Sequence, residues 1–212
     1  MSNNDSPLAF SYNSARFLKS AAKLSQCPED TGVEIAFAGR SNAGKSSAIN
    51  AITNNRKLAR TSKTPGRTQL INFFSLSQQD VRLVDLPGYG YAQVSLDMKA
   101  EWGKHLDIYL RERQCLAGLV LIMDIRKPLT DFDQMMLDWS AQCAMPTLIL
   151  LTKADKLKNN AARQASFEVK KALAEHPTLV EVLPVSSMKK TGIDKCHRVL
   201  NQMITQAFAD SA

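Results

Sequence analysis

The sequence predicts an α/β fold, with a mostly parallel six-stranded sheet that has one antiparallel strand and helices on both faces. Two observations carry this prediction. Short apolar, β-branched runs alternate with longer helix-like segments along the 212 residues, an order that is typical of doubly wound sheets. The runs are also almost continuously hydrophobic, which indicates strands that are covered on both faces.

Each element follows from these runs. Strands are predicted near Val33–Ala38, Leu70–Leu76, Val81–Asp85, Leu116–Asp124, Thr147–Thr152 and Val180–Val185. Helices are predicted over Lys45–Thr53, Leu96–Glu112, Thr130–Ala144, Ala161–Ala174 and Ile193–Phe208. The second and third strands are joined by only a few polar residues, too few for a parallel crossover, so we expect them to form an antiparallel hairpin.

Composition favours one globular domain in a reducing compartment. Hydrophobic residues make up 44% and charged residues 22% of the chain, as in ordinary globular proteins. The longest apolar run, Cys115–Met123, is far shorter than the ~20 residues that span a bilayer. The N-terminus lacks the features of a secretory signal, and the four scattered cysteines form no CxxC pair. We therefore expect a cytoplasmic protein with reduced thiols and no membrane partner.

The net charge of +7 is unevenly distributed. Residues 1–70 hold ten basic and four acidic residues, a net charge of +6, whereas the remaining residues hold seventeen and sixteen, a net charge of +1. This asymmetry indicates a polyanionic partner, either a nucleic acid or an anionic membrane. The absence of a basic amphipathic helix or a lipidation motif weighs against the membrane.

The stretch GRSNAGKS matches G-x-x-x-x-G-K-[ST] and lies between a predicted strand and a predicted helix, the context that a phosphate-binding loop (P-loop) requires. Gly39 and Gly44 allow backbone N–H groups to surround phosphate oxygens, and the following helix adds its positive end. Lys45 supplies a charge at the β- and γ-phosphates, and the Ser46 hydroxyl can bind Mg²⁺. The motif predicts a nucleoside triphosphate as the ligand.

Three further motifs follow at strand ends, DLPG, TKAD and VSS. In DLPG, Asp85 is placed to hold Mg²⁺ through water, and the Gly88 N–H to approach the γ-phosphate. In TKAD, the Asp155 carboxylate can accept hydrogen bonds from the N1–H and the exocyclic amine of guanine, while Lys153 lays its stem along the base. Adenine offers no such donor pair, so TKAD favours GTP and argues against an ATP-dependent enzyme.

Two strand-end positions complete this interpretation. Backbone N–H groups of VSS (Val185–Ser187) can reach the guanine O6 atom. Thr152 stands where the common N-K-x-D motif has asparagine, and its shorter side chain is expected to tie the P-loop less firmly.

A basic loop separates the P-loop helix from the next strand. RKLARTSKTPGRTQ, Arg56 to Gln69, holds five basic residues and no acidic one, and its Pro, Gly and hydroxyl residues predict a loop. Thr68, in preference to Thr64, is expected to complete the Mg²⁺ shell, so that GTP orders the loop and hydrolysis releases it. A simple solvated basic loop is the alternative interpretation of the charges.

The residue after DLPG predicts slow hydrolysis. Many GTPases place a glutamine there to orient the attacking water, but this chain has Tyr89, whose phenol cannot copy the amide's donor and acceptor. Asn42 of the P-loop is a candidate for helping to hold a monovalent cation. We hypothesise that K⁺ there does part of the work of an arginine finger.

Four blocks, GRSNAGKSS, TSKTPGRTQLINFF, VDLPGYGYA and LLTKADK, resemble the EngB (YihA/YsxC) family of bacterial GTPases, and the resemblance extends from about Val33 to the last helix. It implies a P-loop NTPase G domain of the TRAFAC class, Mg²⁺ dependence, a role in large ribosomal subunit assembly, and a link to cell division and septation. The stretch before Val33 matches less clearly, so no role is carried over there. We predict an N-terminal extension over 1–32, an EngB-type G domain over 33–208, and a C-terminal tail over 209–212.

The resemblance carries functional roles onto matching positions. It implies Lys45, Thr68 and Gly88 in catalysis, and Ser46 and Thr68 as Mg²⁺ ligands, to which the DLPG motif adds Asp85. The implied nucleotide contacts are Gly39, Arg40, Ser41, Asn42, Ala43, Gly44, Lys45, Ser46, Ser47, Gly66, Arg67, Thr68, Gln69, Leu70, Asp85, Leu86, Pro87, Gly88, Thr152, Lys153, Ala154, Asp155, Val185, Ser186 and Ser187.

The leading hypothesis is a slow GTPase that acts as a nucleotide-switched assembly factor. It would bind ribosomal RNA of the large subunit or its precursor through the basic loop Arg56–Arg67. The alternative is a division-linked GTPase switch that binds a protein partner and has no direct RNA role. No coiled-coil pattern or dimer signature is present, so we expect a monomer.

Overall fold

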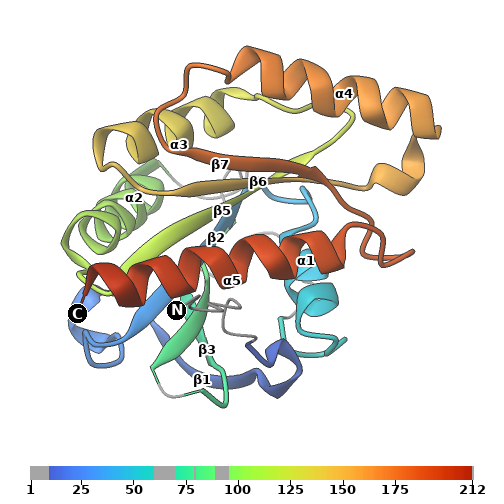
Figure 1. Cartoon of the computed structure of the whole chain (residues 1–212). Coiled ribbons are helices and arrows are strands. Elements are labelled where there is room, and N and C mark those ends of the chain that lie inside the picture. The colour runs from blue at the N-terminus through green and yellow to red at the C-terminus, as the bar shows by residue number, and fades with distance from the viewer. Residues whose placement is uncertain (1–9, 60–69, 79, 89–95, 212) are drawn as a thin grey trace, which may run out of the picture.

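The computed structural model describes residues 10–59, 70–78, 80–88 and 96–211, in which seven strands form one sheet (Figure 1). The strands are β1 (Arg16–Ala21), β2 (Val33–Gly39), β3 (Ile71–Ser75), β4 (Val81–Asp85), β5 (Leu116–Asp124), β6 (Thr147–Thr152) and β7 (Leu179–Pro184). The helices are α1 (Lys45–Ile52), α2 (Leu96–Glu112), α3 (Asp131–Gln142), α4 (Asn159–Ala172) and α5 (Ile193–Asp210). Short 3-10 turns are η1 (Tyr12–Ser14), η2 (Leu24–Gln26) and η3 (Ala154–Lys156).

The sheet is mostly parallel, and its strand order is β1-β3-β4-β2-β5-β6-β7. Among the described strands, β3 alone runs against the others, pairing antiparallel with β1 on one side and β4 on the other. The pairs from β4 to β7 are all parallel. The predicted fold class and the antiparallel hairpin are therefore confirmed, and β1 is a seventh strand that the sequence analysis did not predict.

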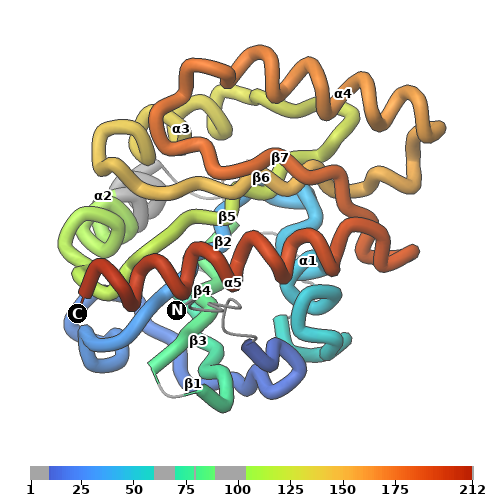
Figure 2. Tube along the Cα trace, viewed as in Figure 1, coloured from blue at the N-terminus to red at the C-terminus, as the bar shows by residue number. Residues whose placement is uncertain are grey.

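Two hydrophobic layers explain why the strands are almost continuously apolar. Along β2, Ile35 and Phe37 belong to the core beneath α1 and α5, whereas Ala36 and Ala38 belong to the core beneath α2, α3 and α4. Successive strand residues point to opposite faces, so both faces need apolar side chains. Figure 2 shows α1 and α5 lying together on one side of the sheet, with α2, α3 and α4 on the other.

Element boundaries agree closely with the predictions. β4, β5, β6 and α2 have the predicted bounds, and the other predicted elements differ by at most two residues at an end. The start of α3 is set by a capping box, in which Thr130 and Asp133 exchange hydrogen bonds. Within the described part of the chain, no helix is long and apolar enough to cross a membrane. The domain boundaries remain a prediction, although β1 lies in the stretch assigned to an extension and α5 runs to Asp210.

Candidate nucleotide site

Four parallel strands direct the predicted motifs to one edge of the sheet. β2 ends at Gly39, β4 at Asp85, β6 at Thr152, and β7 at Pro184, just before the VSS motif. In open α/β sheets the crevice outside the carboxyl ends of the strands is where ligands bind. The fold thus brings together four motifs that are far apart in the sequence.

The P-loop has two glycines that other residues would not replace without strain. A Cβ atom at Gly39 would lie 2.9 Å from the Ile122 side chain, so the close approach of β2 to β5 depends on this glycine. Gly44 has a φ of 101°, and a Cβ there would lie 3.3 Å from Thr152 Oγ1. Asn42 also adopts a left-handed conformation, with a φ of 64°, which asparagine tolerates better than most residues. The loop then enters α1, whose first N–H groups have no partner within the helix.

Lys45 and Asp85 form an ion pair at the mouth of the P-loop. Their side chains are only 11% and 9% exposed, so the pair is mostly shielded from water. Leu86 N donates to Phe37 O at 3.0 Å, which continues the contact between the β2 and β4 strand ends. Gly88 then lies against the P-loop, where a Cβ would be 3.7 Å from the Cα of Ser41.

The TKAD motif holds the P-loop through two side chains. The Thr152 hydroxyl donates to Ala43 O and also lies 3.0 Å from Met123 O. Lys153 Nζ donates to Asn42 O at 2.6 Å. Although threonine is shorter than asparagine, its hydroxyl reaches the P-loop backbone from the buried end of β6.

Asp155 is oriented by the VSS motif. The buried Ser186 hydroxyl donates to Asp155 Oδ1 at 2.7 Å, and this hydrogen bond lowers the pKa of the carboxyl group. Ala154 N donates to Val185 O at 3.1 Å, which joins the two loops through their backbones. Asp155 is therefore an ionised acceptor, the state that the predicted guanine contact needs.

Several predicted residues lie outside the described residues: Gly66, Arg67, Thr68, Gln69 and the positions of Thr64 and Tyr89. Leu70 is described, and it is 39% exposed.

The basic loop is described as far as Ala59, and Asn50 of α1 holds it there. The Asn50 amide accepts from Ala59 N at 2.8 Å and donates to Ala59 O at 2.9 Å. The sequence analysis did not predict this role of Asn50. Asparagine has a low helix propensity, so its presence within a short helix is a weak signal of a role outside the helix.

The oxygen atoms available for a metal fit Mg²⁺. Ser46 lies in the first turn of α1 and Asp85 ends β4, and a hydroxyl and a carboxylate are hard ligands of the kind that Mg²⁺ accepts alongside waters and phosphates. In the described parts of the chain, no group of three or more His, Cys, Asp or Glu side chains is arranged to hold a metal.

Comparison with known proteins identifies the family. Residues 34–153 match a family model described as "50S ribosome-binding GTPase". The chain is 54% identical over 205 residues to the "Probable GTP-binding protein EngB" of Pasteurella multocida, covering 97% of this chain and all of that protein. It is 51% identical over 205 residues, with the same coverage, to the protein of that description from Haemophilus influenzae.

The fold is also found in solved structures. A crystal structure of "a probable GTP-binding protein engB" is similar with a TM-score of 0.66 and 21% sequence identity, and covers 82% of this chain and all of that one. At such identity the likeness concerns the fold, while the relatives above are close enough to establish kinship. The chain therefore belongs to the EngB family of GTP-binding proteins and is a GTPase.

Proposed function

We propose that this GTPase is a nucleotide-switched factor in assembly of the large ribosomal subunit, working in the cytoplasm as a monomer. Its GTP state would bind the ribosomal particle, and slow hydrolysis would release it. The observation that carries the proposal is the joint placement of the P-loop, the Lys45–Asp85 pair and the Ser186-oriented Asp155 at one sheet edge. A link to cell division and septation would follow from this role or from a separate protein partner.

The residues of the site would divide the work as follows. Backbone N–H groups of residues 39–46 would cradle the phosphates, and Lys45 would exchange Asp85 for phosphate oxygens. Asp155 would read the guanine edge, and the backbone of Val185–Ser187 would reach O6. When bound, Mg²⁺ would neutralise charge on the β- and γ-phosphates, held by Ser46, Thr68 and, through water, Asp85.

Slow turnover would follow from Tyr89 at the glutamine position, and a K⁺ ion would assist. Asn42 supports this part of the proposal because its side chain is exposed while Lys153 holds its carbonyl oxygen. Turnover measured in K⁺ and then in Na⁺ tests it, and equal rates would remove the cation from the mechanism.

Attachment to ribosomal RNA would use the basic loop Arg56–Arg67. Arg56 and Lys57 are exposed, and Asn50 accepts from Ala59 N and donates to the carbonyls of Ala59 and Arg56 (3.2 Å). These bonds hold the first two cations of the loop beyond the C-terminal end of α1, the helix that begins at the P-loop. The description of the family as ribosome-binding agrees with such a partner.

Co-sedimentation with ribosomal subunits tests the proposal, with GDP or a non-hydrolysable GTP analogue at two salt concentrations. We expect large-subunit binding that needs the analogue and weakens with salt. Replacing Arg56 and Lys57 by Gln should lower the slope of log affinity against log salt by about two, with free nucleotide affinity unchanged. The control replaces Arg163 and Lys171 of α4 by Gln. Absence of binding in both states would favour the protein-partner alternative.

A further inference from the structure

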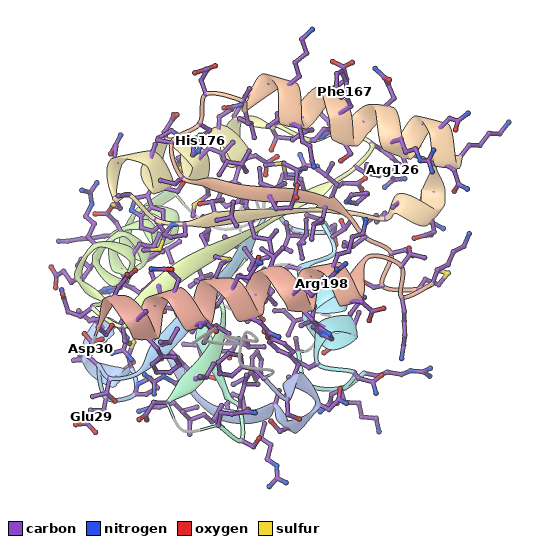
Figure 3. The ribbon with its side chains drawn as sticks, in the orientation of Figure 1. Glu29, Asp30, Arg126, Phe167, His176 and Arg198 are labelled. Atoms are coloured by element: carbon purple, nitrogen blue, oxygen red, sulfur yellow. The ribbon has the colours of Figure 1, made fainter. Side chains whose placement is uncertain are left out.

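Asp124, the last residue of β5, lies between two cations beside the TKAD motif. Its Oδ2 atom is 2.6 Å from Arg126 Nη2 and 3.0 Å from Lys153 Nζ. The three side chains are partly exposed, at 17% for Asp124, 50% for Arg126 and 31% for Lys153. Figure 3 places Arg126 near the start of α4, at the end of the molecule where β6 leads into TKAD. Asp124 was not among the residues that the sequence motifs predicted for the site.

Sheet register explains how Asp124 reaches Lys153. β5 and β6 are parallel neighbours, and Asp124 is the register partner of Thr152, which directly precedes Lys153. Lys153 has a left-handed backbone, with a φ of 58°, at the turn into η3. The side chain is thus held between the end of β5 and the P-loop by elements of the central sheet.

Lys153 needs such anchors to act on a base. A lysine side chain has many rotamers, and ordering it costs entropy, so an unanchored one would have to be ordered by the ligand. Here the ammonium has two fixed acceptors, Asn42 O at 2.6 Å and Asp124 Oδ2 at 3.0 Å. With its end fixed, the stem is presented in advance as a surface for a planar base.

Arg126 in turn holds Asp124. Its guanidinium makes a two-pronged contact, with Nε to Oδ1 at 2.9 Å and Nη2 to Oδ2 at 2.6 Å, and its backbone N–H donates to Oδ1 at 3.1 Å. Paired hydrogen bonds of this type fix the plane of a carboxylate. The Arg126 side chain is the main cause of a lowered pKa of Asp124, so the carboxylate remains charged.

We propose that Asp124 is a positioning residue for guanine nucleotide binding, which fixes Lys153 over the base and is itself fixed by Arg126. The inference rests on the proposed assignment of the base site to Lys153 and Asp155. Many exposed ion pairs contribute almost nothing to stability. This cluster differs because one of its cations is Lys153, whose stem is predicted to lie along the base. Loss of the cluster should therefore weaken ligands that carry a base more than ligands that have only phosphates.

The test compares two ligands in the full-length protein. Asp124→Ala should weaken GDP about tenfold, at the low end of the effect of losing a hydrogen bond to a charged group, mainly through faster dissociation. Inorganic tripolyphosphate, which has no base, should lose less than about twofold. Arg126→Ala leaves the carboxylate in place and should give a smaller loss of the same kind. Glu181→Ala, which breaks a Lys170–Glu181 pair of 2.6 Å away from the site, is the matched control.

The same substitution, made in protein that already lacks Lys153, distinguishes this inference from the proposed base site. In Lys153→Ala protein, Asp124→Ala should cause no further loss of GDP affinity. An equal loss for GDP and tripolyphosphate, or an undiminished loss without Lys153, would overturn the positioning role while leaving the base site intact. If Lys153→Ala itself left GDP affinity unchanged, the base site would be wrongly assigned and the inference would fall with it.

Discussion

The strand pair β2–β4 carries charged side chains at both ends, and the two ends are built differently. At the amino end, Glu34 faces Arg82 in the strand register, and all of its partners are internal. At the carboxyl end, Asp85 faces Phe37 in the register and pairs with Lys45 at the mouth of the P-loop. We call the first the closed end. The second borders the P-loop, whose N–H groups are left for a ligand, and we call it the open end.

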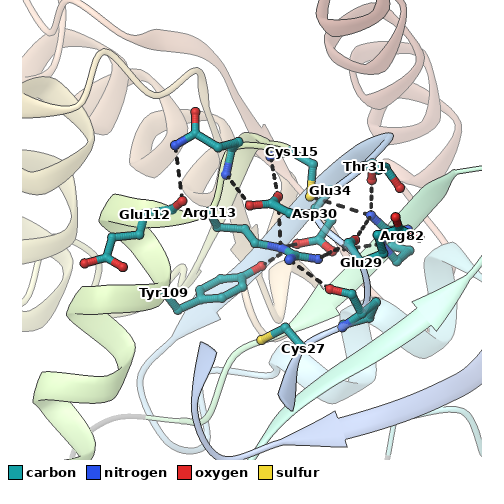
Figure 4. Close-up of polar contacts among 12 residues, drawn as sticks. Cys27, Glu29, Asp30, Thr31, Glu34, Arg82, Tyr109, Glu112, Arg113 and Cys115 are labelled. Carbon is teal, nitrogen blue, oxygen red and sulfur yellow. Dashed lines mark hydrogen bonds and ion pairs between the residues drawn. The ribbon is translucent and has the colours of Figure 1, made fainter. Parts of the chain in front are cut away.

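The closed end is a buried ionic network (Figure 4). The Glu34 carboxylate is fully buried and accepts from Arg82 Nε at 2.8 Å, Arg113 Nη2 at 2.7 Å and Tyr109 OH at 2.9 Å. Arg113 also donates to the backbone carbonyls of Pro28 and Glu29, at 3.0 and 3.1 Å. The network therefore joins the end of α2 to the chain before β2. Buried charges are tolerated when they are paired and hydrogen-bonded in this way.

The difference separates the charged side chains that stabilise the fold from those that are available to bind a ligand. The Glu34 carboxylate is fully buried and both of its oxygens accept from internal donors, so it is not available to a ligand. Within the described part of the chain, the Lys45 and Asp85 side chains pair with each other, a contact that phosphate and metal could replace. The distinction is testable, because mutations at the two ends should affect different quantities.

The largest effect is expected at the closed end. Glu34→Ala leaves Arg82 and Arg113 buried without their shared carboxylate, and removal of one partner from a buried pair costs about 3–5 kcal/mol. Urea unfolding, monitored by circular dichroism, should show this loss of free energy of unfolding. GDP affinity of the folded protein should change less than about twofold, because none of the network's bonds within the described residues is to a predicted nucleotide residue. A loss of affinity larger than the loss of stability would contradict the comparison.

The next effect is expected at the open end and concerns the ligand. Lys45→Ala removes the cation predicted to bind the β- and γ-phosphates, so GTP affinity should fall about 10- to 100-fold, as for loss of hydrogen bonds to a charged group. The free energy of unfolding without nucleotide should fall less than in Glu34→Ala, since Asp85 lies at the mouth of the site. Calorimetric titration with GTP measures the first quantity and urea unfolding the second. Retained GTP affinity would contradict the assignment of the phosphate site.

The same contrast explains how far the sequence could predict the molecule. The apolar runs predicted six strands, because burial on both faces leaves a continuous pattern, and the longer helix-like segments between them predicted all five described helices. β1 was missed because it is an edge strand whose residues Arg16–Lys19 are all exposed, so no apolar run marks it. The P-loop, DLPG, TKAD and VSS motifs predicted neighbours at the open end, where each motif has a chemical purpose.

The closed end could not be predicted in this way. Glu34 and Arg82 each appear as a single polar residue within an apolar run, in VEIAFA and VRLVD. Only the register, which the chain does not encode locally, places them opposite each other. Glu34 and Arg82 are each the second residue of their strand, and this shared position is the signal that would have suggested the pair. The contacts of Asp124 and Thr152 with their partners likewise depend on register.

The smallest effect concerns the pH dependence of base binding. Asp155 has a lowered pKa, first because Ser186 donates a hydrogen bond to it, with Lys156 and Lys189 adding smaller contributions. A carboxylate with a lowered pKa stays ionised as the pH falls, so its contacts are lost only below the ordinary value of 3.8. Ser186→Ala should move the pKa back toward that value. GDP affinity should then begin to fall at a higher pH than in the unaltered protein.

Fluorescent GDP binding measured from about pH 3 to pH 7, a range that extends below the ordinary pKa of an aspartate, would detect this shift. At neutral pH the two proteins should differ little, because Asp155 is ionised in both. Ser187→Ala changes the adjacent hydroxyl of the same motif and serves as the control. If the acid limbs of the Ser186→Ala and control profiles coincide, the hydrogen bond merely orients Asp155 without setting its charge. At the open end, Ser186 would then set only the orientation of Asp155 toward guanine. At the closed end, the same contacts fix both the charge and the position of Glu34.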